Sequence, residues 1–184
     1  MIIGRDVCGV SVGAGGLAGL VAAIPLYVPV GEVRRARVSS LSTDPVSGEP
    51  TRAVVDFGST PEGADAGPEL EVATRLWPGA EGAGERVLRG LCAERALMEL
   101  RARDPLGAGA LSLGEGAVWS RGVVEVEGRD LVSVVVEAGS SWVAAVDAGA
   151  GVLLRVYARA PGPGRVRLRR VVDAGELEPL RGRG

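Results

Sequence analysis

The sequence contains no histidine, lysine, asparagine or glutamine, so all 21 of its cationic residues are arginine. Without histidine, the chain cannot form a Ser-His-Asp triad or bind a metal through imidazole. Without lysine, it cannot form a Walker-type phosphate loop, a protein-kinase site or a Schiff base. The codons of the four missing residues begin with A or C and have A in the middle, which indicates a GC-rich bacterial genome.

Cysteines and aromatic residues are also scarce. The two cysteines, Cys8 and Cys92, do not make a disulfide framework, and the sequence leaves their redox state open. The side chains that remain for chemistry are those of Asp, Glu, Arg, Ser, Thr, Tyr and Cys, and they form no specific constellation along the chain. We therefore expect no catalytic residue, no metal and no cofactor, and the composition favours a protein that is not an enzyme.

The 184 residues are 46% apolar, which is enough to bury the core of one domain. The net charge of −2 is unevenly spread, because residues 151–184 carry +5 and residues 1–150 carry −7. The basic C-terminal strand contains four arginines: Arg165, Arg167, Arg169 and Arg170. These arginines are candidates for binding an anionic partner such as RNA or an acidic lipid, or they complement the acidic body of the protein itself.

Residues 1–30 form an apolar, glycine-rich segment that precedes the single α+β domain expected over residues 31–184, which ends in the basic strand and tail. No residue from 7 to 29 is charged, and about 20 apolar residues suffice to cross a bilayer as a helix. The many glycines and two prolines argue against a membrane anchor or uncleaved signal, and the first six residues lack the positively charged start of a signal peptide. Residues 7–30 are thus either a membrane anchor or the first element of the domain, and both a cytoplasmic and an envelope-anchored location stay open.

The same segment carries an alternative prediction, a dinucleotide-binding turn. Residues 10–19 read as a strand, a glycine turn and the start of a helix, similar to the turn of flavin and NAD enzymes that holds a pyrophosphate. The cofactor-binding residues would be Gly13, Gly15 and Ala18, with Glu32 on the ribose. No strand–helix alternation follows, so the parallel sheet that normally supports such a turn is not expected.

From residue 33 to residue 172, short apolar strands alternate with turn-rich links, a pattern typical of antiparallel sheet. The expected strands are 33–41, 51–57, 69–76, 123–127, 131–137, 142–147, 152–159 and 165–172. Gly128-Arg129 is the expected two-residue loop of one hairpin. The predicted fold class is α+β, a curved antiparallel sheet made of about three strands, one long helix and then a five-strand meander.

The helix is expected over residues 81–103, ending before Pro105. Val87, Leu91 and Met98 fall within about 40° of one another on a helical wheel and predict its buried face. Arg95 falls near the middle of that face, which makes the amphipathic pattern imperfect.

Three acidic motifs are candidate sites. The pairs Glu69/Glu71 and Glu125/Glu127 each place two carboxylates on one face of a strand, and we expect both pairs on solvated faces. The run Asp56-Phe57-Gly58-Ser59-Thr60 looks like the first phosphate loop of actin-like ATPases, but the partner motifs of that family do not follow. A strand that ends in a turn explains the same residues.

Residues 124–130 and 142–156 carry a family resemblance. The strand that ends in Gly128-Arg129, followed by Trp142, Asp147, Gly151 and Arg155, is similar to the late strands of the lipoprotein-carrier and sigma-regulator superfamily. In that family the tryptophan stands closer to the aspartate, and a threonine stands where Ala150 is. The resemblance covers about residues 123–172 and implies a curved half-barrel of antiparallel strands closed by helices, exported and holding lipid or a hydrophobic peptide.

Together these features predict a non-enzymatic binding or structural domain that acts through a curved β-sheet. The alternatives are a dinucleotide- or flavin-binding protein that uses the Gly13–Gly19 turn, and an envelope-anchored carrier of lipid or hydrophobic peptide. A protein partner or a second copy of the chain is expected rather than nucleic acid. A lipid or hydrophobic ligand, and a membrane contacted by residues 7–30, are the further expected partners.

Overall fold

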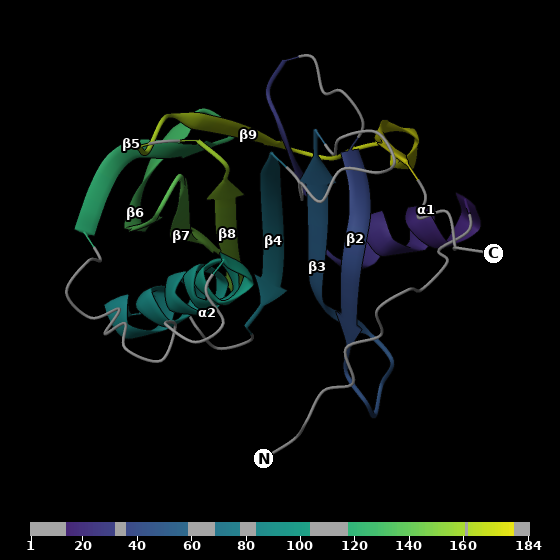
Figure 1. Cartoon of the computed structure of the whole chain (residues 1–184). Coiled ribbons are helices and arrows are strands. Elements are labelled where there is room, and N and C mark those ends of the chain that lie inside the picture. Colours follow the sequence, from purple (N-terminus) through teal and green to yellow (C-terminus); the bar gives the residue numbers. More distant parts are fainter. Residues whose placement is uncertain are drawn as a thin grey trace.

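The computed structural model of the chain describes residues 14–31, 36–58, 69–77, 84–103, 118–160 and 162–178. In these residues ten strands form one sheet, accompanied by two α-helices and one 3-10 turn (Figure 1). The elements in chain order are α1 (Ala14–Ala23), β1 (Tyr27–Pro29), β2 (Ala36–Thr43), β3 (Pro50–Phe57), β4 (Leu70–Leu76), α2 (Glu85–Arg103), β5 (Val118–Val126), β6 (Arg129–Ala138), β7 (Ser141–Gly149), β8 (Val152–Ala158), β9 (Val166–Arg170), η2 (Ala174–Glu176) and β10 (Leu177–Glu178). The chain is therefore α+β and dominated by its sheet.

The sheet is strongly curved and nearly closed. Its strand order is β1-β9-β5-β6-β7-β8-β4-β3-β2-β10, with most neighbours antiparallel. The segment 171–176, which contains η2, leads directly from β9 near one end of this order to β10 at the other end. Since so few residues join them, the two edges of the sheet must curve toward each other.

The predicted strand layout differs from the structure at the edges of the sheet. Four strands precede α2 and six follow it, because the short strands β1 and β10 add to the expected three and five. The last strand of the expected five-strand meander was also misplaced. Only β5 to β8 form a meander, whereas β9 crosses over to pair in parallel with β5 and antiparallel with β1. Local turn signals could not reveal this crossover, because it depends on non-local pairing.

Two hairpins of the meander close through residues with positive φ. Glu127 (φ 49°) and Gly128 (φ 78°) join β5 to β6, one residue earlier than the expected Gly128-Arg129 loop. Ala150 (φ 53°) and Gly151 (φ 73°) join β7 to β8 in the same way. Positive φ at both central residues is typical of the type I′ turn, whose twist matches that of the flanking strands.

The concave face of the sheet encloses the main core. Side chains that alternate inward from the strands, such as Phe57, Trp142 and Leu154, are packed together and almost fully buried. Leu17 and Leu20 of α1 and Leu26 beside β1 belong to the same cluster. The described part of residues 7–30 thus forms a ten-residue helix and a strand that pack with the sheet. In the described residues, no helix is long and apolar enough to span a membrane.

The second helix, α2, packs on the convex face, opposite to α1 (Figure 1). It lies against β6, β7 and β8 through Leu88, Leu91, Cys92 and Ala96. The predicted apolar face was partly wrong, because Met98 is 56% exposed while Arg95 is buried. The buried face is centred closer to residue 95, so the arginine that broke the pattern lies on the packed side of the helix.

Substitution of Ala150 tests the type I′ turn. Alanine at a positive φ costs about 1–2 kcal/mol of backbone strain, which glycine avoids. Glycine also makes the unfolded chain more flexible, and this offsets part of the stability that relief of the strain adds. We expect Ala150→Gly to raise the free energy of unfolding in urea by about 0.5–1 kcal/mol. The control Ala18→Gly, at an exposed position of α1, should lower it by a similar amount. A loss of stability in both variants would contradict the assigned turn.

Candidate functional site

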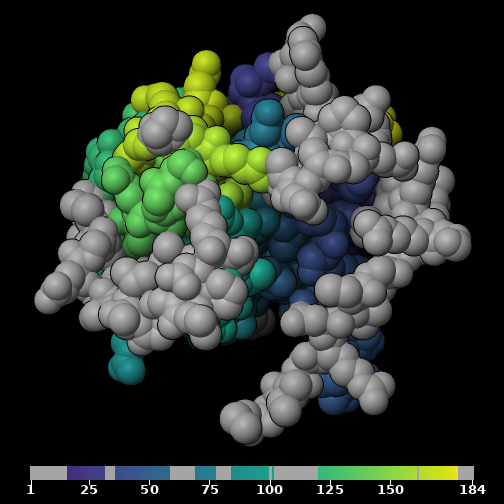
Figure 2. Space-filling view, viewed as in Figure 1, coloured from purple at the N-terminus to yellow at the C-terminus, as the bar shows by residue number. Residues whose placement is uncertain are grey.

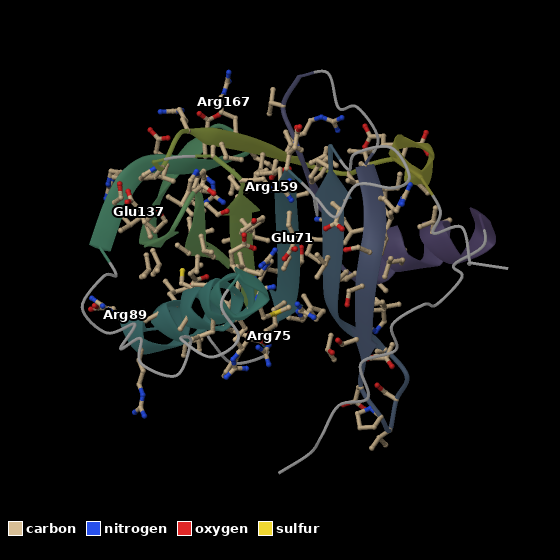
Figure 3. All side chains as sticks on the ribbon, viewed as in Figure 1. Glu71, Arg75, Arg89, Glu137, Arg159 and Arg167 are labelled. Atoms are coloured by element: carbon tan, nitrogen blue, oxygen red, sulfur yellow. The ribbon has the colours of Figure 1, made fainter. Side chains whose placement is uncertain are left out.

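The convex face of β3, β4 and β8, next to α2, carries a concentration of charged side chains. Along each strand, alternate residues point into the core, so that the residues between them point outward. The outward residues are Arg52 and Asp56 on β3, Glu71 and Arg75 on β4, and Arg155 on β8, while Glu94, Arg95 and Glu99 face them from α2. Figure 3 shows Glu71 and Arg75 on β4 above and beside α2.

Five of these side chains form a partly buried ion-pair cluster, which consists of Glu71, Glu94, Arg95, Glu99 and Arg155. The Glu71 carboxylate accepts from Arg155 Nη2 and from Arg95 Nε, each at 3.3 Å. Arg155 Nη1 lies 3.4 Å from Glu94 Oε2, and Arg95 Nη1 lies 3.4 Å from Glu99 Oε2. Glu71 on β4 is therefore linked to β8 through Arg155 and to α2 through Arg95.

Tyr157 packs against this ion-pair cluster. The Arg95 guanidinium lies over the Tyr157 ring, with 3.8 Å between Cζ and the ring centroid, a favourable cation–π geometry. The Tyr157 hydroxyl is 3.1 Å from Ser141 Oγ, and Ser141 Oγ lies 3.5 Å from Glu99 Oε1. Arg95 thus has an aromatic and two carboxylate partners, which explains how a cation fits in the packed face of α2.

Asp56 lies at the edge of the ion-pair cluster, opposite Glu71 in the β3–β4 pairing. Burial, and then the negative charge of Glu71, raise the pKa of Asp56 to about 6, while a hydrogen bond from Ser39 opposes the shift. Its Oδ1 is buried without a hydrogen-bond partner in the described part of the chain. The charge of Asp56 therefore changes near pH 6.

The expectation that the paired glutamates are solvated is wrong for one member of each pair. The side chains of Glu71 and Glu125 are only 12% and 9% exposed. In each case two arginines from other parts of the chain contact the carboxylate and compensate its charge. Strand alternation located the outward face correctly, but only tertiary pairing decides whether that face is in water.

The four arginines of the predicted anion-binding strand lie on and beside β9. Figure 3 shows one of them, Arg167, away from Glu71 and Arg75. Arg165 and Arg167 both bind Glu125, and Arg165 also contacts Asp130 at 2.9 Å. These hydrogen bonds lower the pKa of Glu125. Arg169 contacts Glu176 at 2.8 Å. Three of the four arginines thus face carboxylates of the same chain.

The predicted dinucleotide residues are described only in part. Gly15 and Ala18 lie in α1, whereas Gly13 and Glu32 lie outside the described residues. Ala18 and Arg170, from two separate predictions, line the same open groove of about 560 Å³ between α1 and η2. The other residues that line it are mostly small or apolar.

Cys92 is the one cysteine among the described residues. It is fully buried between α2 and the sheet, with Sγ 3.3 Å from the carbonyl oxygen of Val134. Burial raises the pKa of its thiol to about 12, so the reactive thiolate is disfavoured. Cys8 lies outside the described residues. Within them, no group of three or more metal-binding side chains is present.

Comparison of the chain with family models, with curated proteins and with solved structures returned no match. The resemblance to the lipoprotein-carrier and sigma-regulator superfamily therefore stays a prediction. Of the charged residues on the convex face, the sequence pointed to Arg95 as an irregularity of the helix and to Glu71 and Asp56 as members of acidic motifs. Nothing in it predicted that Arg95 and Glu71 lie beside Arg155. Arg52, Arg75 and Arg155 were not predicted as site residues, because their relation depends on the β3–β4 and β4–β8 pairings.

Substitution of Glu71 tests the ion-pair cluster. Glu71→Gln leaves the guanidinium groups of Arg95 and Arg155 without their shared carboxylate, and unpaired buried charges are costly. We expect the free energy of unfolding at pH 7 to fall by about 3 kcal/mol. The control Glu85→Gln removes the exposed partner of Arg89 and should cost less than about 1 kcal/mol. Equal losses in the two variants would mean that the cluster does not contribute to stability as described.

Asp56 predicts a pH dependence of stability. Because the pKa of Asp56 is higher in the folded state (about 6) than its ordinary value of 3.8, the folded state binds this proton more tightly. Its stabilising contribution is complete below pH 4 and is lost as the pH rises to 6 and above.

We expect Asp56→Asn, which stays neutral, to be more stable than the natural protein by about 3 kcal/mol at pH 8 and nearly equal to it at pH 4. Urea denaturation at both pH values measures this difference. A variant that is destabilised more at pH 8 than at pH 4 would contradict the assignment.

Proposed function

We propose that the protein is a non-enzymatic binding domain that acts through the convex face of its curved sheet, at β3, β4 and β8 beside α2. The observation that carries this proposal is the ion-pair cluster together with two neighbouring arginines, Arg52 and Arg75. Neither of the two has a carboxylate within ion-pair distance among the described residues. A face that holds buried charges in fixed positions beside uncompensated ones is suited to recognising a charged group.

Stability alone gives a poor explanation for this arrangement. Desolvation of charged groups offsets much of the attraction in a buried ion pair, and apolar side chains of similar volume often stabilise a protein as well or better. A network such as Glu71–Arg95–Arg155 does, however, hold guanidinium groups in defined orientations. Fixed orientation is what a binding surface requires, because less freedom is lost when the ligand binds.

The concave side gives less support to the alternative of a carrier for lipid or hydrophobic peptide. The space inside the sheet is filled by the protein's own side chains, among them Phe57, Trp142 and Leu154. A hydrophobic ligand would have to displace them. The carrier therefore requires an opening of the core, whereas binding on the convex face uses the structure as it stands.

The dinucleotide alternative rests on residues that are only partly described. In dinucleotide-binding folds the helix after the glycine turn leads to a strand parallel to the first. Here α1 leads to β1, which pairs antiparallel with β9 at an edge of the sheet. The convex face thus remains the site with the most direct structural support.

The tryptophans allow a direct test of the proposed face. Trp77 is 39% exposed next to Arg75, and Trp142 is 2% exposed in the core. We expect NMR titration with a fragment library of carboxylates, phosphates, amines and neutral aromatic compounds to shift the indole N–H signal of Trp77 and the amide signals of β3, β4 and β8. The indole signal of Trp142 should stay in place.

The alternatives give other patterns in the same experiment. Hits that shift Trp142 and the inward-facing residues would support a carrier and contradict the proposal. Shifts confined to α1, including Ala18, would point to the groove between α1 and η2 and would also contradict it. A library without any hit on β3, β4 or β8 counts equally against the convex face.

A further inference from the structure

A small recess opens on the convex face beside the ion-pair cluster. Three arginines line it, Arg52 from β3, Arg75 from β4 and Arg155 from β8, together with the apolar side chains of Ala73, Leu91 and Leu153. No carboxylate is among these lining residues. In Figure 2 the surfaces of β3, β4 and α2, blue to teal, meet near the centre of the face shown.

Strand pairing brings the two arginines at the rim, Arg52 and Arg75, side by side. Arg52 and Arg75 stand directly opposite in the β3–β4 pairing, and like charges in such positions repel. Both side chains reach solvent, and Arg75 lies over the Trp77 ring at 5.5 Å. This rim therefore carries two positive charges that no carboxylate of the described residues compensates.

The third arginine, Arg155, is 4% exposed and incompletely hydrogen-bonded. Its Nη1 and Nη2 contact Glu94 and Glu71, but its Nε is buried without an acceptor in the part of the chain that the structure describes. Burial is the main cause that lowers the pKa of Arg155, and the charge of Arg52 acts in the same direction. A buried donor without an acceptor costs free energy, and a small shift of the Arg155 side chain toward an anion in the recess would give this Nε–H an acceptor.

We propose that this recess binds an oxyanion of the phosphate type. This inference rests on the function proposed for the convex face, and it specifies the ligand. With a volume of about 10 Å³, the enclosed part holds a single water-sized group. One oxygen of the anion would enter beside Arg155, and the rest would lie at the rim between Arg52 and Arg75. Guanidinium groups suit this role because their planar donors match phosphate and carboxylate oxygens.

Charge favours phosphate over carboxylate as the ligand. A phosphate monoester carries about −1.5 to −2 at pH 7, which matches the two uncompensated arginines at the rim. A carboxylate supplies only a single charge and leaves one of them unmatched. The same phosphate chemistry is available from a free phosphate ester and from the headgroup of an acidic lipid, and experiment separates these two sources.

The Nε–H signal of Arg155 is the most direct reporter, because this proton lacks an acceptor among the residues that the structure describes. We expect inorganic phosphate, titrated into the full chain at constant ionic strength, to shift this signal downfield and to change Trp77 fluorescence with the same saturation curve. Acetate and chloride at equal concentration should bind at least tenfold more weakly. In the second arm of the experiment, the same signal is followed as vesicles of phosphatidylcholine, with and without phosphatidic acid, are added.

Matched variants separate a specific site from general attraction to positive charge. Arg52→Gln together with Arg75→Gln should weaken phosphate binding at least tenfold. The control pair, Arg86→Gln with Arg101→Gln, removes the same charge from exposed positions of α2 and should change affinity less than twofold. Both double variants alter surface residues, and circular dichroism verifies that they are folded.

The outcomes distinguish the two proposals. A shift of the Arg155 signal with phosphate, or only with phosphatidic acid vesicles, supports the oxyanion site and identifies its source. If fragments bind the convex face while phosphate and both vesicles leave Arg155 unchanged, water alone occupies the recess and the oxyanion proposal fails, whereas the proposed function stands. If the control pair weakens binding as much as the rim pair, the attraction is non-specific and the oxyanion proposal fails as well.

Discussion

Antiparallel pairing of β4 with β8 joins the strands that precede α2 to those that follow it. The register runs from Leu70 opposite Ala158 to Leu76 opposite Val152, across about 80 residues of intervening chain. This one pairing makes a single curved sheet out of β2–β4 and the β5–β8 meander, and it aligns their inward-facing side chains into one core. The same register brings Glu71 next to Arg155 on the convex face, so the ion-pair cluster exists only because these strands meet.

The two faces of the sheet are dominated by different interactions. On the concave face, apolar side chains fill the space and α1 packs against them, which gives the hydrophobic stabilisation expected of a core. On the convex face, α2 covers β6–β8, and charged residues lie where its cover ends. Arg155 there is close to low-dielectric protein and poorly hydrated, a setting in which its interaction with a bound anion is stronger than in open water. The proposed oxyanion site follows from this boundary between helix-covered and uncovered sheet.

Arg95 and Glu71 illustrate which structural features a sequence pattern can predict and which it cannot. Arg95 interrupts the apolar face of a well-marked helix, and the sequence showed this only as an imperfect amphipathic pattern. Glu71 alternates with apolar residues, and the pattern correctly placed it on the outward side of its strand. What neither pattern contains is the partner, because Glu71, Arg95 and Arg155 are brought together by strand pairing and helix docking across long stretches of chain. For the same reason the crossover of β9 and the edge strands β1 and β10 were missed.

By itself, the sequence determined the α+β class, the long helix and the eight longer strands, because apolar periodicity, prolines and glycines act over a few residues. It also restricted the chemistry, since a chain without histidine and lysine has only arginine to supply positive charge. The tertiary structure decided which arginines are neutralised and which are not. Arg165 and Arg167 meet Glu125, whereas Arg52 and Arg75 face each other across a strand pair. Charge compensation depends on distances of a few ångströms between residues far apart in sequence, and only the folded chain fixes those distances.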